Sequence, residues 1–120
     1  MLSLTGTVVH GKGEARGTGY PTANLDYAGI EHPEVGVWTC RVTMEDAVHH
    51  GLAVIGMWNM EGGAPSVEVY LLDVQKNLYG KELTVTPLIK LRELMAFETM
   101  DVLVAQIKKD IQDARAVFGI

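Results

Sequence analysis

The chain has little cysteine, no long hydrophobic run and no visible secretory signal, and each observation argues against a class of protein. Its single cysteine, Cys40, cannot form an internal disulfide, which fits a reducing cytoplasm. No apolar run approaches the ~18 residues that a membrane span needs. The first residues have neither the basic start nor the apolar stretch of a secretory signal. We therefore expect a cytoplasmic protein with no membrane partner.

Basic residues are also in short supply. Ten Lys and Arg against fifteen Asp and Glu leave a formal net charge of −5. Proteins that hold a phosphate backbone usually carry an excess of positive charge, so we expect no nucleic-acid partner. With 120 residues, 48% of them hydrophobic, the chain is long enough for one domain with its own core. We expect a soluble monomer.

Several catalytic motifs are missing as well. The four histidines have no zinc-ligand spacing, and no G-x-S-x-G nucleophile motif occurs. The glycine-rich stretch "HGKGEARGTG" (10–19) fits neither a P-loop nor a dinucleotide fingerprint, because Arg16 stands where each motif needs glycine and Pro21 soon follows. Either this stretch is a flexible hairpin loop, or its backbone N–H groups approach a phosphate.

Most of the chain has the pattern of short β-strands. Five segments are rich in β-branched residues and bounded by glycine: 4–10, 36–44, 52–57, 66–74 and 82–91. Short connections, including a hairpin turn at "EDAVHHG" (45–51), predict a largely antiparallel barrel or sandwich.

The last quarter of the chain has helical periodicity. Apolar residues recur at helical spacing from Met100 to Phe118, with Thr99 as a candidate N-cap and Gly119 as the stop. The pattern predicts one amphipathic helix whose apolar stripe is packed as core against the β-structure.

Two polar groups stand at unusual strand positions. In "SVEVYLLD", Glu68 shares a face with Ser66 and Tyr70, opposite Val67, Val69 and Leu71. That face is either solvated, or it places a carboxylate in a cleft where it can accept a substrate proton. In "YPTANL", Thr22 and Asn24 present oxygens to one side. They form either a local turn or a site for a hard cation such as Mg²⁺.

These pieces resemble the riboflavin kinase family over almost the whole chain. The resemblance is carried, in the family's order, by "GTVVHG" with "ARGTGYPTANL", by "GVWTCRV", "LAVIG" and "VEVYLLD", and by "LYGKELTVTPLIKLRELMAFETMDVLVAQIKKDIQDAR". It implies a six-stranded antiparallel Greek-key β-barrel with a packed C-terminal α-helix. The expected kinase-like domain spans 1–120, with the barrel at about 1–97 and the helix at about 99–118.

The resemblance also implies an activity, the transfer of the ATP γ-phosphoryl group to riboflavin to give FMN and ADP. It makes Glu68 the catalytic base and assigns Mg²⁺ and the phosphates to Thr22 and Asn24. On the flavin side it implies Arg92, Leu94 and Phe97. The remaining implied nucleotide-binding residues are Gly11, Lys12, Gly13, Arg16, Gly17, Gly19 and Pro21.

The sequence departs from the family pattern in places. "MWNM" (57–60) replaces a segment resembling Arg-Pro-Thr-Phe, and Leu94 and Ala96 stand where Glu and Lys are usual. These differences keep open an alternative function, a flavin- or nucleotide-binding module without turnover. A weaker third possibility is an interaction domain with no small ligand. No adenylyltransferase sequence lies within the 120 residues, so we expect no FAD synthesis from them.

Overall fold

The computed structural model describes residues 2–9, 19–20, 22–27, 34–56, 65–74 and 77–120. The regular elements in these ranges are six strands followed by one helix. They are β1 (Leu4–Val9), β2 (Ala23–Tyr27), β3 (Gly36–Met44), β4 (Ala47–Ile55), β5 (Val67–Leu71), β6 (Glu82–Arg92) and α1 (Met100–Phe118).

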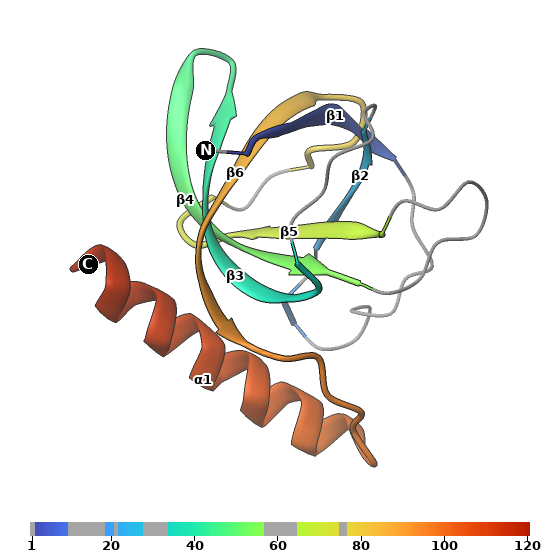
Figure 1. Cartoon of the computed structure of the whole chain (residues 1–120), viewed down its shortest axis with the longest axis vertical. Helices are drawn as coiled ribbons and strands as arrows, with labels where there is room; N and C mark the ends of the chain where they lie inside the picture. The colour runs from blue at the N-terminus through green and yellow to red at the C-terminus, as the bar shows by residue number, and fades with distance from the viewer. Residues whose placement is uncertain (1, 10–18, 21, 28–33, 57–64, 75–76) are drawn as a thin grey trace.

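The strands close into an antiparallel barrel in the order β1-β2-β5-β4-β3-β6, with β6 pairing back to β1 (Figure 1). The non-sequential neighbours β2–β5, β3–β6 and β6–β1 give the order its Greek-key character. Helix α1 crosses outside the barrel, beside β4 and the end of β6. The predicted six-stranded barrel with a packed C-terminal helix is therefore confirmed.

The barrel interior is filled by alternating side chains from all six strands. In β5, Val67, Val69 and Leu71 point inward and are buried, as the alternation in the sequence predicts. They pack with buried residues of the other strands: Leu4, Val8, Leu25, Cys40, Val42, Met44, Ala53, Ile55, Leu83 and Val85. Residues that alternate with these, among them Thr22 and Glu68, consequently lie on the outer face.

A second, smaller core lies between the outer face of the barrel and the helix. Its buried members are Val37, Leu52, Leu72 and Ala114. The strand sequence "GLAVIG" is apolar on both faces because Ala53 and Ile55 pack inside the barrel while Leu52 packs outside. Apolar side chains on this outer face hold α1 in place.

The ends of α1 are the ones that the sequence predicts. The Thr99 side chain accepts a hydrogen bond from the Val102 backbone N–H at 3.2 Å, which caps the start of the helix. Gly119 ends the helix in the left-handed conformation, with φ of 73°.

The predicted apolar stripe is only partly core. Ala114 is buried, but Leu103 and Ile107 line a cavity instead. The expectation that the whole stripe packs as core was therefore wrong at the N-terminal half of the helix. There residues of the segment 92–97 line the cavity together with the helix.

Two strand predictions also need correction. The segment 45–51 is not a turn: only Glu45 and Asp46 turn, both with positive φ, and β4 begins at Ala47. A two-residue turn of this kind matches the twist of a hairpin, so pairing starts at Met44 and Ala47. The second correction is β2 (Ala23–Tyr27), because the residue pattern predicted a turn or a cation site there and no strand.

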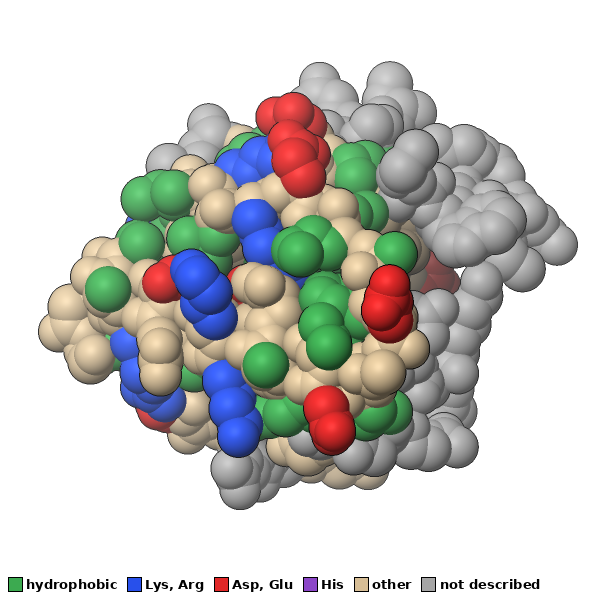
Figure 2. Space-filling model, turned by 90° about the horizontal axis from the view of Figure 1, so that it is seen from below, with side chains coloured by type: hydrophobic (Ala, Val, Ile, Leu, Met, Phe, Trp, Pro, Cys, Tyr) green, Lys and Arg blue, Asp and Glu red, His purple; other side chains and the backbone are tan. Residues whose placement is uncertain are grey.

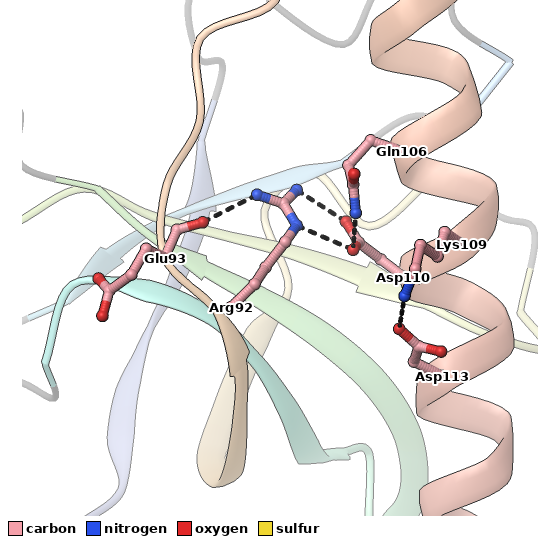
Figure 3. A network of polar contacts seen from close by, with 6 residues as sticks. All are labelled: Arg92, Glu93, Gln106, Lys109, Asp110 and Asp113. Carbon is pink, nitrogen blue, oxygen red and sulfur yellow. Dashed lines mark hydrogen bonds and ion pairs between the residues drawn. The ribbon is translucent and has the colours of Figure 1, made fainter.

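Strand β6 pairs irregularly with β3 near its C-terminal end. Its register against β3 shifts twice, between Val37 and Trp38 and between Thr39 and Cys40. The hydroxyl of Thr39 accepts a hydrogen bond from the Ile89 N–H at 3.1 Å, so this buried polar group is satisfied. Bulges bend a strand and re-aim its side chains. Beyond them, β6 ends at Arg92, whose side chain faces α1 (Figure 3).

Candidate functional site

A polar cluster forms on the outer face where β2 pairs with β5. Asn24 lies directly opposite Glu68 in the register, and Ala23 lies opposite Val69. Directly opposed residues point to the same side of a sheet, so Asn24 and Glu68 share the outer face. Thr22 lies two residues before Asn24, and its hydroxyl donates a long hydrogen bond of 3.4 Å to Glu68 Oε1. A hydroxyl, an amide and a carboxylate therefore meet at one place.

A cavity of about 310 Å³ opens beside this cluster. It lies between the outer face of the barrel, residues 92–97 and the N-terminal half of α1. The lining residues are Tyr20, Thr22, Val37, Leu52, Val54, Glu68, Tyr70, Arg92, Leu94, Met95, Phe97, Leu103, Ile107 and Asp110.

The cavity has apolar walls and few polar groups. Leu52, Val54, Leu103, Ile107 and Phe97 give it side chains suited to a flat or bulky apolar ligand. The polar side chains belong to two groups, one around Glu68 on β5 and one formed by Arg92 with Asp110. Such a site can bury a hydrophobic ring system while presenting a carboxylate to a polar group of the ligand.

Tyr20 and Tyr70 form an aromatic pair in the cavity wall. Their rings meet edge to face, with centroids 6.0 Å apart. Burial raises the pKa of the Tyr70 hydroxyl, and the neighbouring Tyr20 and Asp73 raise this pKa further while Arg115 lowers it. Tyr70 therefore stays protonated at neutral pH and can donate a hydrogen bond, two residues along β5 from Glu68.

The second polar group joins β6 to α1. Arg92 donates from Nε to Asp110 Oδ1 at 2.9 Å and from Nη2 to Asp110 Oδ2 at 2.8 Å (Figure 3). Gln106 Nε2 also donates to Asp110 Oδ1 at 2.9 Å. The side chains of Arg92 and Asp110 are only 19% and 6% exposed. This is a bidentate, largely buried ion pair at the edge of the cavity.

Asp110 was missed by the sequence analysis, although the sequence carried a signal. It lies three residues after Ile107 and four before Ala114, in the middle of the apolar stripe. A carboxylate at a stripe position has to be buried with a partner, since an unpaired buried charge is costly. The sequence of the stripe could not show which basic side chain pairs with Asp110.

The structure brings most of the described site predictions together. Glu68, Thr22, Arg92, Leu94 and Phe97 all line the cavity. Of the two interpretations of Glu68, the cleft is the one observed, because its side chain is half-buried there.

The other predicted nucleotide-binding positions fall into two groups. Gly19 is exposed in a turn with φ of 84°. Outside the described residues lie Gly11, Lys12, Gly13, Arg16, Gly17, Pro21 and the departing segment 57–60. Both interpretations of residues 10–19, a flexible hairpin loop or a backbone that binds a phosphate, therefore remain predictions.

The oxygen atoms near Glu68 fit a hard divalent cation. Within the described ranges, no group of three His, Cys, Asp or Glu side chains could hold a metal by itself. Thr22, Asn24 and Glu68 nevertheless offer hydroxyl, amide and carboxylate oxygens on one face. Mg²⁺ commonly binds through few protein oxygens and completes its shell with water and substrate phosphates. The donor set suits a metal shared with a phosphorylated substrate.

Comparison with known proteins agrees with this geometry. The model of the Flavokinase family, described as riboflavin kinase, matches residues 1–118. The chain belongs to the riboflavin kinase family. Members of this family use ATP as co-substrate and generally need a divalent metal.

Similar proteins include longer riboflavin kinases from bacteria. A bifunctional riboflavin kinase/FMN adenylyltransferase of Listeria monocytogenes is 37% identical over 95% of this chain and 37% of its own length. The RNA-binding riboflavin kinase of Bacillus subtilis is 36% identical over 92% of this chain and 49% of its own length. The chain thus spans less than half the length of these relatives.

Solved structures support the fold. A crystal structure of a Streptococcus pneumoniae protein named as a macrolide-efflux protein matches with a TM-score of 0.86 and 32% identity, over 95% of this chain and 38% of that one. The riboflavin kinase of Trypanosoma brucei matches with a TM-score of 0.65 and 25% identity, over 98% of this chain and 79% of that one. In the described part of this chain, no helix combines the length and the apolar character needed to cross a bilayer.

Proposed function

We propose that this chain transfers the γ-phosphoryl group of ATP to the 5′-hydroxyl of riboflavin, giving FMN and ADP. The observation that carries the proposal is the position of Glu68, at the rim of an apolar cavity and beside Thr22 and Asn24. The family assignment supplies the reaction class. The cavity supports the choice of acceptor because its walls suit an aromatic ring system.

In this proposal Glu68 acts as the general base. Its carboxylate takes the proton of the 5′-hydroxyl as that oxygen forms a bond to the γ-phosphorus, and the bond from phosphorus to the ADP oxygen breaks. Phosphoryl transfer depends mostly on positioning and on charge stabilisation, so one carboxylate is enough protein acid–base chemistry. The register between Asn24 and Glu68 supports placing the base beside the phosphate-binding residues.

Thr22 and Asn24 are proposed to hold Mg²⁺ and the terminal phosphates. When bound there, the cation would neutralise charge on the phosphates. The glycine-rich stretch with Gly11, Lys12, Gly13, Arg16, Gly17, Gly19 and Pro21 is proposed to form the rest of the nucleotide site.

The flavin is proposed to lie in the apolar cavity. Leu94 and Phe97 contribute to one wall, Leu103 and Ile107 to the helix side. Arg92 stands at this wall, with its guanidinium carbon 5.9 Å from the centre of the Phe97 ring. A ligand filling this space would exclude water, which otherwise competes with the 5′-hydroxyl for the phosphoryl group.

The arrangement of Thr22, Asn24 and Glu68 favours turnover over the alternative of a degenerate binding module. A module that only bound flavin would need the apolar cavity but no carboxylate beside two phosphate ligands. We further propose a monomeric, cytoplasmic enzyme with no nucleic-acid partner, supported by the charge of −5 and the single buried thiol. Because one relative is named as RNA-binding, a gel-shift titration with RNA is the appropriate check.

The decisive test is direct synthesis of FMN. Purified protein is incubated with riboflavin, ATP and Mg²⁺, and the flavins are separated by chromatography. We expect FMN only when all three are present, and none after chelation of the metal. Absence of FMN with retained quenching of riboflavin fluorescence would identify the degenerate module. Absence of both would leave only the interaction domain.

A further inference from the structure

The ion pair between Arg92 and Asp110 connects three parts of the cavity. Arg92 is the last residue of β6, and Asp110 lies on α1. The third part is the segment after β6, because Arg92 Nη1 donates to the Glu93 backbone carbonyl at 3.0 Å. One guanidinium group therefore holds a strand end, a helix and the start of the segment that forms the cavity wall (Figure 3).

The wall that follows has few other polar attachments among the described contacts. Leu94, Met95 and Phe97 line the cavity, yet their segment has no regular secondary structure. Leu94 packs against the second core, whereas Met95 is 52% exposed, so packing fixes this segment at Leu94 and less firmly beyond it. The Lys90–Glu93 pair lies on the exposed side. The position of the wall relative to α1 thus depends on the direction in which Arg92 points.

Asp110 determines that direction. Its two oxygens accept from two different nitrogens of Arg92, which sets the plane of the guanidinium group. Gln106, one turn earlier on α1, donates to Asp110 Oδ1 and orients the carboxylate in turn. The chain of contacts runs from Gln106 through Asp110 and Arg92 to the backbone of Glu93.

We propose that Asp110 is a positioning residue for the flavin: through Arg92 it sets the place of the 93–97 wall and thereby the affinity for riboflavin, without touching the phosphate site. This inference rests on the proposed function for its ligand. Among the described residues, the contacts of the Glu68 cluster join β2 to β5, whereas those of the Asp110 network join β6 to α1. A change at Asp110 should consequently alter the affinity for riboflavin more than the affinity for Mg·ATP.

Helix α1 offers a matched control. Lys109 and Asp113 form an ion pair at 2.8 Å on the same helix, drawn beside the network in Figure 3. Asp113 does not line the cavity, and its side chain is 45% exposed. Asp113→Asn therefore makes the same change from carboxylate to amide where no cavity wall depends on it. Figure 2 shows the face of the molecule seen from below, where charged and hydrophobic side chains are mixed over the surface.

The experiment compares Asp110→Asn with Asp113→Asn and Asp110→Glu. Riboflavin affinity is measured by flavin fluorescence quenching, KM by FMN formation, and the wall by amide exchange of residues 93–97 without ligand. We expect Asp110→Asn to speed exchange in 93–97 and to raise the Kd and KM for riboflavin about tenfold. The KM for Mg·ATP should change less than about twofold, because the phosphate site lies on other strands. Asp113→Asn should match the wild type in every measurement.

Asp110→Glu covers the case in which the asparagine variant does not fold. It keeps the buried charge pair but displaces the carboxylate by one methylene, so we expect riboflavin binding to weaken by at least about threefold. The inference is overturned if a folded Asp110→Asn, or Asp110→Glu in its place, keeps wild-type riboflavin affinity. It is also overturned if riboflavin and Mg·ATP are affected equally. Failure of the wild-type protein to bind riboflavin or form FMN would instead reject the proposed function, while the exchange comparison would still test the wall.

Discussion

At the scale of single residues, the site depends on which side of a strand each side chain occupies. Glu68 is outside the barrel because Val67 and Val69 fill the interior. Asn24 joins it because β2 pairs with β5 in the register that sets these two residues opposite each other. A shift of one residue in either strand would turn the polar side chain toward the core. Barrel packing therefore enforces the position of the proposed base.

Removing the charge of Glu68 tests its role. Glu68→Gln keeps the size and the outward position of the side chain, so the fold and nucleotide binding should persist. We expect kcat to fall by roughly 10²–10⁴-fold, the usual contribution of a general base. Steady-state FMN formation measures this, and Glu82→Gln, an exposed glutamate at the start of β6, is the control. A Glu68→Gln variant with near-normal kcat would remove this carboxylate from the mechanism.

Asn24 tests the other side of the cluster. If its amide oxygen serves the metal and phosphates, Asn24→Ala should weaken Mg·ATP binding by about tenfold to a hundredfold, the loss of one hydrogen bond to a charged group. Riboflavin binding should stay nearly intact, since the cavity wall is formed by other residues. Calorimetric titration of each ligand measures both. Equal losses for both ligands would indicate a folding defect and not a phosphate-binding role.

At the scale of elements, α1 has two functions along its length. Its C-terminal half packs against the barrel through Ala114, and His50 of β4 stacks against Phe118 with ring centres 4.2 Å apart. Its N-terminal half forms a cavity wall through Leu103 and Ile107. The first turn is thus held less by packing than the last, which makes its cap important.

The cap at Thr99 should contribute measurably to stability. Thr99→Ala removes the acceptor for the Val102 N–H, and loss of an N-cap typically costs about 1 kcal/mol. For a chain of this length the melting temperature should fall by about 3–6 °C. Thr99→Ser keeps the hydroxyl and should stay close to the wild type. Thermal unfolding followed by circular dichroism measures both, and equal melting temperatures for wild type and Thr99→Ala would show that the cap is not stabilising.

At the scale of the whole molecule, closure of the barrel separates a packed interior from the outer surface on which the cavity lies. The inside is tightly filled, and Cys40 at the centre of β3 is completely buried. The cavity lies outside, between barrel and helix. The proposed ligand would therefore contact the outer face and the helix, and not the residues that fill the barrel.

The thiol of Cys40 reports on the integrity of that core. Burial raises its pKa from 9.0 to about 12, so the reactive thiolate is strongly disfavoured in the folded protein. We expect iodoacetamide at pH 8 to leave native Cys40 unmodified and to alkylate it fully in guanidinium chloride, as measured by intact mass. Rapid alkylation of the native protein would contradict a closed core.

The same thiol has a consequence for stability at high pH. Its folded pKa lies above its unfolded value, so its contribution to stability is complete below about pH 9 and is lost as the pH rises toward about 12. Urea unfolding of wild type and Cys40→Ala across this range should show a steeper loss for the wild type. Parallel pH profiles would contradict this linkage.

Local patterns determined much of this protein. The period of two in β5 identified the buried valines and the outward Glu68, and the period of 3.6 with Thr99 and Gly119 gave α1 its observed limits. These features depend on neighbours within a few residues, which a sequence shows directly. The resemblance of "YPTANL", "VEVYLLD" and "LYGKEL" to one family led to the barrel and to Arg92, Leu94 and Phe97, which line the cavity.

Tertiary structure decided what depends on partners far apart in the chain. Strand β2 is short and polar, and it forms because β1 and β5 provide hydrogen-bonding neighbours on both sides. Leu103 and Ile107 line a cavity because strands far earlier in the chain and residues 92–97 form its other walls. Asp110 is buried because Arg92, eighteen residues earlier, reaches it from the end of β6. Such pairs stabilise only the folded chain, since neither partner is stabilised until the other is in place.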